Sequence, residues 1–598
     1  KFSMRRKNKN FFKRTGRNSQ SFQGKIFVIH FLFIILFLFL GYRLYNIQVK
    51  ENLKFVNQAE ALHDTTTILP PNRGLIYFQD KNKEYIPVAI NKKYNSLFAI
   101  PKEIENPEEV SKLLSEIIPS SYGLSYEQIF SRLSKVDDPY EPLIKKIEDD
   151  DLIDNIKNAQ IKGIHLKEES YRYYPLGSSA AQVIGFVGEA DDGLIKGRYG
   201  LESYYDTILS GRKGIFTGIK DALGRLVRSN FSEEEKTIEG LSIETTIDKN
   251  IQFATDKALK NLIESREASK GTIIVMEVKT GRILALANLP TFNLNDFSDI
   301  KNYSIFRNFA TEERYEPGSV IKPFTMAAGI DTDKVTPDTT YIDKGYYEIG
   351  GFRITNYQLQ VHGKTTMRDV LNYSINTGAI FVSEQVGNET LRKYFKKFGF
   401  AEITGVDLPL EITGDLSNLE YPKSNPTYFA TASYGDGISV TPIALIRAYT
   451  IIANKGRLVT PYLVESTRDR AGNRTSLIST ESSSNPEQII SQETAETLTS
   501  MLVGVIEDGY GGNAKIKGYS LAGKTGTSFV SLEGEKGYSD DVVHSFIGFF
   551  PASNPEYIIL VKMNKPQWGK DAASHTVTLA FKEVERFLIN YYNVPPDE

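Results

Sequence analysis

The sequence predicts an α+β protein with one membrane helix near its N-terminus and a C-terminal sheet covered by helices. Three observations lead to this class. A continuous apolar segment occupies residues 26–42, directly after a basic arm. Residues 44–240 mix short extended runs with polar helices. From about residue 241, strand-like runs are followed by helical periodicity and then by further strands. This order is typical of a sheet covered by helices.

The chain is too long for one compact core. Its 598 residues correspond to about four units at roughly 150 residues per domain. Hydrophobic residues make up 40% and charged residues 24%, which is typical of a globular protein. Cysteine is absent, which excludes disulfides, thiolate metal sites and a cysteine nucleophile. The six histidines form no H-E-x-x-H pattern, so we expect neither a metal nor a cofactor.

The basic arm and the apolar segment together predict a membrane anchor. Residues 1–25 hold nine Lys and Arg and no Asp or Glu, whereas the rest of the chain carries 62 basic against 74 acidic groups. The predicted helix covers residues 26–43, and its apolar part spans about 26 Å at ~1.5 Å per residue. Lys25 and Arg43 can extend to the headgroups. The positive-inside rule places the arm in the cytoplasm and residues 44–598 outside.

Other interpretations of this segment fit the sequence less well. A cleaved signal peptide requires small residues at a cleavage site, and none follows the apolar segment. A buried core helix does not explain the basic flanks. The membrane segment also argues against a nucleic-acid-binding arm, so we expect no nucleic acid partner. Because no ATP is available outside the membrane, the reaction must use energy already stored in its substrate.

Residues 241–598 carry the periodicities of the predicted sheet and its covering helices. Lys279-Thr280-Gly281 indicates a hairpin between two β-rich runs. Residues 231–240 indicate a connector, and residues 481–486 indicate an exposed loop. We expect strands at 271–277, 282–288, 514–530, 542–550 and 557–563, and helices at 319–330, 366–386 and 491–507.

Ser319 and Lys322 form an S-x-x-K pattern that can supply a nucleophile and its base. Pro323 must fall in the first helical turn, which predicts a helix start near Ser319. The two side chains then share a face, and the helix dipole favours the serine alkoxide. A neutral lysine can take the serine proton. Its pKa must fall from ~10.4 toward ~7, through burial and a second cation nearby. The same pattern at 210–213 and 298–301 lies in polar, turn-like sequence, and we attribute it to chance.

Ser374-Ile375-Asn376 follows 55 residues after Ser319, where a helical stretch meets Thr377-Gly378. A hydroxyl and an amide at this place can relay a proton and hold a substrate amide. A helix cap explains the same residues equally well when this motif is taken alone.

Lys524-Thr525-Gly526-Thr527 lies in a strand-like run, 150 residues after Ser374. Lys524 would be the second cation, and the two threonine hydroxyls can hold a substrate carboxylate. Gly526 would let the substrate approach an edge strand closely. Residues 518–525 also fit the P-loop pattern G-x-x-x-x-G-K-T. A P-loop must open a helix, however, and the sequence continues as extended and turn-like, so we expect no nucleotide.

The ordered motifs S-x-x-K, S-x-N and K-T-G are the signature of the penicillin-interacting serine acyltransferases. The whole chain from the membrane segment onward resembles the class B penicillin-binding proteins, and most closely their division-specific, FtsI-like type. It departs from that pattern at Val320, where threonine is usual, at Asp436, where glutamine is usual, and in a longer segment after Ile76. Further similar stretches are Arg73–Ile76, Arg172–Pro175, Gly185–Gly188, Gly200–Glu202, Thr246–Asp248 with Ile251-Gln252, and Tyr434–Ile438.

The resemblance implies both a fold and an activity. It implies an elongated N-terminal pedestal, dimerisation-like, over residues 44–240. It also implies a transpeptidase domain of the penicillin-binding and serine β-lactamase-like type, an antiparallel sheet covered by helices, over residues 241–598. The activity would be D,D-transpeptidation of peptidoglycan stem peptides during septal wall synthesis, inhibited by β-lactam antibiotics. The protein would lie in the bacterial cytoplasmic (inner) membrane as a single-pass protein, beside a SEDS-type glycan polymerase and divisome proteins.

The resemblance also assigns roles to the motif residues. Ser319 would attack a D-Ala–D-Ala peptide bond, with Lys322 as base, Ser374 as proton relay and Asn376 as a contact to a substrate amide. Lys524 would tune the electrostatics of the site. Thr525, Gly526 and Thr527 would form the substrate-binding strand, and the backbone N–H groups of Ser319 and Thr527 would form the oxyanion hole.

Other functions use the same motifs. An elongation-type class B transpeptidase differs only in its partners. A D,D-carboxypeptidase or β-lactamase-type hydrolase would deliver the acyl group to water, but neither needs a large N-terminal module and an uncleaved anchor. A non-catalytic β-lactam sensor needs an intracellular signalling domain, and a 25-residue arm leaves no room for one. A divisome scaffold that has lost catalysis would have little reason to keep all three motifs.

Overall fold

The computed structural model describes residues 19–51, 65–69, 71–135, 138–190, 195–220, 226–227, 233–478, 486–531, 537–567 and 572–597. The chain divides into two compact units. One consists of residues 1–70 with 213–237, and the other of residues 71–212 with 238–598. Most of the predicted basic arm and of the loop at 481–486 lies outside the described residues, as does part of the connector at 231–240.

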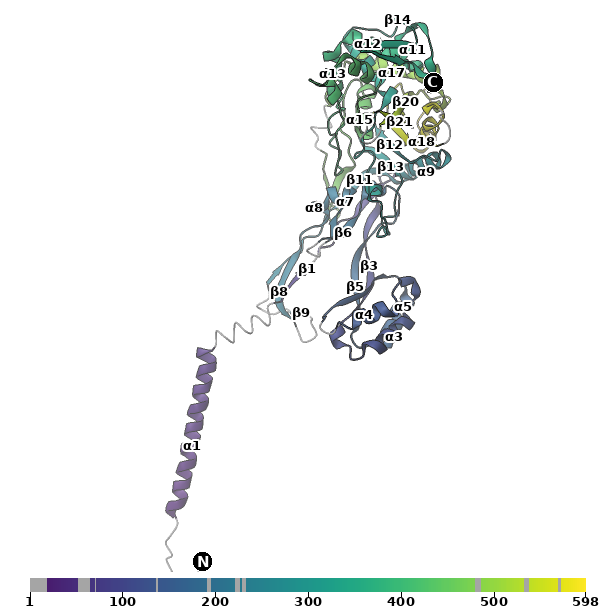
Figure 1. Ribbon diagram of the computed structural model, residues 1–598. Coiled ribbons are helices and arrows are strands. Elements are labelled where there is room, and N and C mark those ends of the chain that lie inside the picture. The colour runs from purple at the N-terminus through teal and green to yellow at the C-terminus, as the bar shows by residue number, and fades with distance from the viewer. Residues whose placement is uncertain are drawn as a thin grey trace, which may run out of the picture. The chain divides into compact units, whose positions relative to one another are not determined.

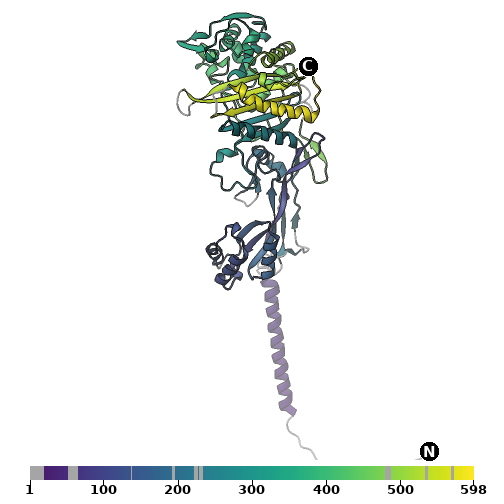
Figure 2. The same cartoon turned by 90° about the vertical axis from the view of Figure 1, so that its right-hand side faces the viewer.

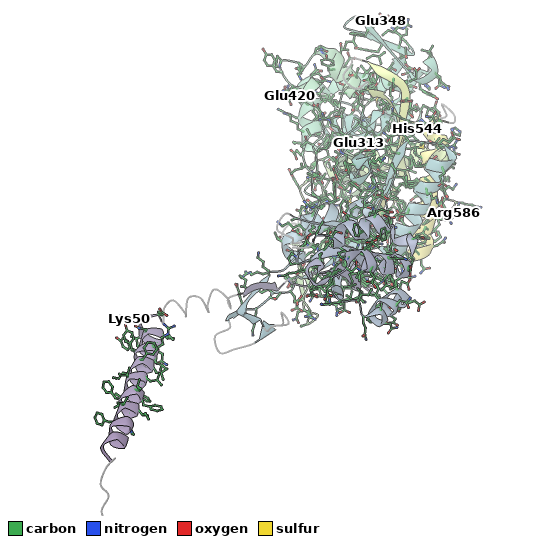
Figure 3. The ribbon with its side chains drawn as sticks, turned by 60° about the horizontal axis from the view of Figure 1, so that its bottom comes forward. Lys50, Glu313, Glu348, Glu420, His544 and Arg586 are labelled. Atoms are coloured by element: carbon green, nitrogen blue, oxygen red, sulfur yellow. The ribbon has the colours of Figure 1, made fainter. Side chains whose placement is uncertain are left out.

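The first unit contains the apolar helix and a small antiparallel sheet. Apolar side chains project from the helix on all sides as far as Lys50 (Figure 3). Within the described residues this is the one helix long and apolar enough to cross a membrane, Phe27–Lys50, with a mean hydropathy of 2.3. The elements are α1 (Ser19–Tyr45), the π-helical turn η1 (Asn46–Lys50), and β1 (Thr65–Leu69), β8 (Gly214–Lys220), β9 (Leu226–Val227) and β10 (Glu233–Glu235), in which β8 pairs with the other three strands.

The second unit begins with a seven-stranded sheet that includes the long strand β3 (Ile86–Ala99). One end of β3 pairs with β2 (Ile76–Gln79), and the other with β4 (Glu141–Ile147) and β5 (Ile164–Tyr173). Three amphipathic helices close a separate small core at the β4 end (Figure 1). They are α3 (Pro107–Ile117), α4 (Tyr126–Leu133) and α5 (Asp150–Ala159), each capped by the side chain of the residue before it.

The same sheet also contains strands from beyond residue 240. β11 (Ser242–Asp248) runs parallel to β2 and antiparallel to β18 (Val464–Arg468), which pairs with β19 (Arg474–Ser476). The domain boundaries at residues 25, 43 and 240 stay predictions. At the last of them, β11 from beyond residue 240 pairs with β2 from before it, so one sheet contains strands from both sides of this boundary.

A buried ion-pair network centred on Glu202 links Arg73, which precedes β2, to Arg172 on β5. The side chain of Glu202 is fully buried and accepts from Arg73 Nε at 2.7 Å and from Arg172 Nε at 2.6 Å. Arg73 Nη1 also donates to Asp206 at 2.7 Å, and the Tyr174 hydroxyl donates to Glu202 at 3.3 Å. Because the charges are desolvated, each depends on its partners far more than a surface ion pair would. Except for Asp206, these residues come from the Arg73, Arg172 and Gly200 stretches that resemble the family.

A five-stranded antiparallel sheet, as the resemblance implies, lies at the centre of the C-terminal region. Successive side chains along each strand point to opposite faces of the sheet, so a separate core forms on each face. Ile273 and Val275 face one core with α9 (Lys249–Ser265) and α18 (Val577–Tyr592), whereas Ile274 and Met276 face the other core, which holds the helices of the site. Figure 2 shows the C-terminal helix α18 lying across the strands. The strand order is β13 (Ile283–Leu289), β12 (Lys270–Glu277), β22 (Tyr557–Asn564), β21 (Tyr538–Phe550) and β20 (Ala522–Ser531).

Helices cover the second face of the sheet, and two small two-stranded sheets accompany them. Most of the predicted elements are confirmed, but three boundaries differ. The helix expected at 319–330 begins with a 3-10 turn, the helix expected at 366–386 is interrupted near Ser374, and the strand expected from residue 514 begins only at Ala522. The elements are η5 (Gly318–Ile321), α10 (Lys322–Asp331), β14 (Thr340–Asp343), β15 (Tyr346–Ile349), β16 (Phe352–Thr355), β17 (Gly363–Thr366), α11 (Met367–Asn372), α12 (Asn376–Val386), α13 (Asn388–Lys397), α14 (Pro426–Ala432), α15 (Pro442–Ala453) and α17 (Gln492–Glu507).

We expect Arg73→Ala to lower the free energy of unfolding by about 3–5 kcal/mol, because it removes one of the two arginines that pair with the fully buried Glu202 carboxylate. Denaturant titration followed by circular dichroism measures this change. Arg470→Ala is the matched control, since Arg470 forms an exposed ion pair with Glu239 that should contribute less than about 1 kcal/mol. Equal losses in the two variants would contradict a buried network.

Candidate active site

The candidate nucleophile lies on a tight turn that precedes α10. Ser319 is partly exposed, while its neighbours Val320 and Ile321 point into the core. Pro323 falls in the first turn of α10, as predicted from its fixed backbone. Gly318 has φ +61°, and a Cβ at this position would come within 2.6 Å of the Thr527 carbonyl oxygen. The turn therefore packs directly against β20, and only glycine fits there.

Lys322 connects the turn to the second motif. Its amine is 3.0 Å from Ser319 Oγ, 3.1 Å from Ser374 Oγ and 2.8 Å from Asn376 Oδ1. It also donates to the Ser374 carbonyl oxygen. Only 1% of Lys322 is exposed, so its amine sits among these oxygens away from bulk water. This arrangement can remove a proton from Ser319.

Ser374 occupies the break between α11 and α12. Its backbone is left-handed, with φ +54°, which is uncommon for a serine. The N-cap of α12 is Ile375, and this helix has no side-chain cap. The helix-cap interpretation of Ser374 is therefore wrong. The hydroxyl instead lies 3.1 Å from Lys524 Nζ as well as 3.1 Å from Lys322 Nζ, which bridges the two amines.

Lys524, Thr525, Gly526 and Thr527 lie on β20, the edge strand of the sheet. Lys524 is fully buried, whereas Thr527 is exposed. A Cβ on Gly526 would come within 2.8 Å of the Pro317 carbonyl oxygen and 2.9 Å of Val320. The glycine thus leaves room for the turn that carries Ser319. Because residues 522–531 form a strand and open no helix, the P-loop interpretation of 518–525 is wrong.

Burial sets the protonation of both lysines. Desolvation, and then the charge of Lys524, holds the pKa of Lys322 well below its usual range. Desolvation also lowers the pKa of Lys524 to about 7. A buried ammonium without a close carboxylate loses more hydration than it regains, so the neutral amine is favoured. Of the two shifts, only that of Lys322 includes a contribution from the charge of the other lysine.

Sequence reasoning missed an acidic group behind the turn. The Glu316 carboxylate accepts from the backbone N–H of Gly437 at 3.1 Å and from the Tyr538 hydroxyl at 3.0 Å, and its own carbonyl oxygen accepts from Ser528 Oγ at 2.5 Å. Glu316 therefore links the turn to β20, β21 and the loop at 434–438. Burial, and then Glu316, raise the pKa of Asp436 in that loop to about 7. The signal for Asp436 was its place in the Tyr434–Ile438 stretch that resembles the family, whereas Glu316 lies in none of the stretches named above.

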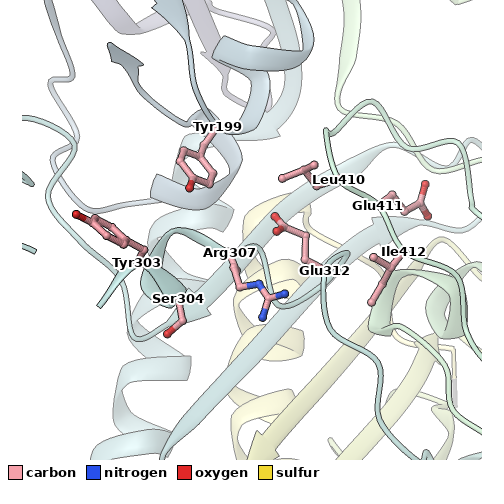
Figure 4. Close-up of a pocket in the computed structure, with 8 residues that line it drawn as sticks. All are labelled: Tyr199, Tyr303, Ser304, Arg307, Glu312, Leu410, Glu411 and Ile412. Atoms are coloured by element: carbon pink, nitrogen blue, oxygen red, sulfur yellow. The ribbon is translucent and has the colours of Figure 1, made fainter. Parts of the chain in front are cut away.

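A cavity lies apart from this cluster. It has a volume of about 700 Å³, and none of the eight predicted site residues lines it. Arg307 and Glu312 both lie near the middle of the view in Figure 4. The remaining lining residues are Tyr199, Tyr303, Ser304, Leu410, Glu411 and Ile412.

Comparisons with known proteins agree with this geometry. Residues 271–584 match the family model described as the penicillin binding protein transpeptidase domain, and residues 68–245 match the penicillin-binding protein dimerisation domain. The chain is 33% identical to stage V sporulation protein D of Bacillus subtilis, over 89% of this chain and 80% of that protein. It is 27% identical to peptidoglycan D,D-transpeptidase FtsI of Escherichia coli, over 86% and 83%. The crystal structure of penicillin binding protein 3 from Mycobacterium tuberculosis, complexed with aztreonam, is 25% identical with a TM-score of 0.66, and covers 89% and 98% of the two chains.

We expect the free energy of unfolding to rise between pH 7 and pH 9, and Lys524→Met to lose part of that rise. The folded pKa of Lys524 lies at about 7, below the unfolded value of ~10.4, so the unfolded chain binds more protons in this interval and stability grows with pH. The difference should be on the order of 1–2 kcal/mol, measured by denaturant titration at both pH values. Lys162→Met, at an exposed lysine, should leave the slope unchanged. Identical slopes in all three proteins would contradict a desolvated Lys524.

Proposed function

The chain belongs to the class B penicillin-binding proteins, and from that premise we propose that it is a serine-type peptidoglycan D,D-transpeptidase with Ser319 as its nucleophile. The observation that carries this proposal is the 3.0 Å contact between Ser319 Oγ and a lysine amine whose charge is disfavoured by burial. A neutral amine at this distance can act as a general base. The relatives named above as transpeptidase and penicillin-binding protein support the same reaction class.

Acylation begins when Ser319 Oγ attacks the carbonyl carbon of the D-Ala–D-Ala peptide bond. Lys322 takes the hydroxyl proton, and the negative charge develops on the carbonyl oxygen. The backbone N–H groups of Ser319 and Thr527 are proposed to stabilise this oxygen, a contribution that typically amounts to about 10²–10³ in rate. The close approach of Gly318 to the Thr527 carbonyl supports this pairing of the turn and the strand.

Collapse of the tetrahedral intermediate breaks the C–N bond and releases D-alanine. The leaving nitrogen needs a proton, which passes from Lys322 through the Ser374 hydroxyl. Ser374 contacts both lysine amines at 3.1 Å, so it can receive one proton while it gives another. The amine of a second stem peptide then attacks the acyl-enzyme, loses a proton to the same base and restores Ser319.

Substrate binding is assigned to β20 and to Asn376. Thr525 and Thr527 would hold the terminal carboxylate, with Lys524 supplying positive charge when protonated. Asn376 Nδ2 donates one hydrogen to the Thr355 carbonyl oxygen at 3.0 Å, which leaves its second hydrogen for a substrate amide. Gly526 keeps this strand flush with the turn of Ser319.

The cellular setting rests on the N-terminal segment and on the family. The apolar helix supports a single-pass anchor in the bacterial cytoplasmic membrane, with the basic arm inside and residues 44–598 outside. A septal role, with a SEDS-type glycan polymerase and divisome proteins as partners, follows from similarity to FtsI. β-Lactams are expected to acylate Ser319 as substrate mimics.

We expect Ser319→Ala to abolish covalent labelling by a fluorescent penicillin, because it removes the hydroxyl oxygen on which the acyl bond is proposed to form. Labelling of the purified full chain is read on a denaturing gel. Ser298→Ala is the control, since Ser298 belongs to the S-x-x-K pattern that we attribute to chance, and it should label fully. Labelling that persists in Ser319→Ala would refute the nucleophile. A donor and acceptor stem-peptide assay then separates amide transfer from hydrolysis, and release of free acid alone would favour a carboxypeptidase.

We expect the labelling rate to rise with pH and to level off once Lys322 has lost its proton. The base must be neutral, and burial lowers the pKa values of both lysines, so acid pH restores the inactive ammonium. Lys322→Arg should lower the rate by about 10²–10⁴-fold at every pH, because a guanidinium does not deprotonate. Stopped-flow labelling from pH 5 to 9 measures both. A flat wild-type profile would contradict a lysine base.

A further inference from the structure

We propose that Asp343 is a positioning residue that fixes the first turn of α12, and with it Asn376, against the lysine of the active site. This inference rests on the proposed acyl-transfer function, because it assigns a supporting part to the same site. Asp343 does not touch Ser319, Lys322 or Lys524 in the described contacts, so it acts through other residues and takes no part in the chemistry itself.

Asp343 is the last residue of β14 and is only 1% exposed. Its carboxylate accepts five hydrogen bonds, all from neutral groups of four residues. The backbone N–H groups of Gly345 and His362 lie at 2.9 and 2.8 Å. Asn356 Nδ2 lies at 3.0 and 2.9 Å from the two oxygens, and Thr377 Oγ1 lies at 2.7 Å. A carboxylate can satisfy so many donors because it has about four acceptor positions.

These contacts connect Asp343 on β14 to the S-x-N motif in two steps. Asn356, which Asp343 holds through its amide nitrogen, uses its amide oxygen to accept the backbone N–H of Thr377 at 3.1 Å. The neighbouring Thr355 carbonyl oxygen accepts from Asn376 Nδ2 at 3.0 Å. Both the main chain and the side chain at the start of α12 are therefore bound to residues 355–356, whose position depends on Asp343.

The start of α12 needs this external support. A helix leaves its first N–H groups without partners, and a side chain at the N-cap usually supplies one. Ile375 stands at that position and offers no acceptor. The left-handed backbone of Ser374 just before it adds strain. Asn356 and Asp343 thus replace the missing cap from another element, and they fix the direction in which Asn376 points toward Lys322, 2.8 Å away.

Asp343→Asn tests this inference with an almost unchanged shape. The new amide nitrogen is a donor and would stand where a carboxylate oxygen accepted hydrogen bonds. At least one contact to Asn356 or Thr377 is therefore lost. We expect the second-order rate of labelling by a fluorescent penicillin to fall by about 100-fold, as for a small misplacement of a catalytic group. Asp407→Asn is the matched control. Asp407 is also a buried carboxylate with two backbone N–H donors, at 2.6 and 2.8 Å, but it binds Leu463 and Val464 away from the site. It should lose stability without losing labelling.

A double-mutant cycle with Asn376→Ala separates positioning from general destabilisation. If Asp343 acts through Asn376, then Asp343→Asn in the Asn376→Ala background should change the labelling rate by less than about twofold. A full 100-fold loss in both backgrounds would overturn the inference. So would a loss in Asp407→Asn as large as that in Asp343→Asn.

Amide hydrogen exchange at Thr377 gives a second result that does not depend on labelling. This N–H should exchange faster in Asp343→Asn than in the wild type and remain protected in Asp407→Asn, because only the first variant loosens Asn356. Unchanged protection in Asp343→Asn would overturn the inference even where labelling falls. Failure of the wild type to label at all would instead count against the proposed function and leave the exchange result decisive for Asp343.

Discussion

Two lysine amines lie within hydrogen-bond reach of one serine hydroxyl, and the surrounding structure keeps them there without bulk water. Lys322 and Lys524 each approach Ser374 Oγ at 3.1 Å. In water both amines would be fully charged and hydrated. In the interior, lost hydration is the largest influence on each of them and favours the neutral form. The result is a base beside Ser319 at neutral pH, obtained through burial. The same burial makes the site destabilising for the fold, since a charged state in the unfolded chain must be given up.

The acidic groups near the site shape the backbone, and no described hydrogen bond or ion pair joins a carboxylate to Lys322 or Lys524. The charge of Asp436 favours the ammonium form of Lys322, but burial and the charge of Lys524 oppose it more strongly. The described hydrogen bonds of Glu316 and Asp343 come from backbone N–H, hydroxyl and amide groups. A carboxylate in direct contact with Lys322 would hold that amine in its charged, unreactive form. Carboxylates one contact further away still fix the turn of Ser319 and the start of α12. This division explains how a site with several buried acids can keep a neutral lysine base.

The sheet brings these parts together because its two faces bury different helices. Along β12, alternate side chains enter separate cores, so the strands are fixed from both sides. β20 stays at the edge, where one side remains free for an extended substrate. Glycines at 318 and 526 let the turn of Ser319 lie directly on this strand, since a Cβ at either would meet backbone within 2.8 Å. The desolvated ion pairs of Glu202 with Arg73 and Arg172 support the seven-stranded sheet that contains β2 and β5.

The sequence by itself determined the apolar helix, the sheet covered by helices and the ordered motifs of Ser319, Ser374 and Lys524. These features are local, because each depends on the spacing or periodicity of neighbouring residues. Only the tertiary structure decided that the helix breaks at Ser374, that Gly526 makes room for the turn, and that Glu316 and Asp343 support the site. Periodicity does not reveal a left-handed residue inside an apolar helical pattern. Nor does it reveal contacts such as that of Asp343 with Thr377. These residues are 34 apart in the chain, and their contact exists only after β14 and α12 have packed together.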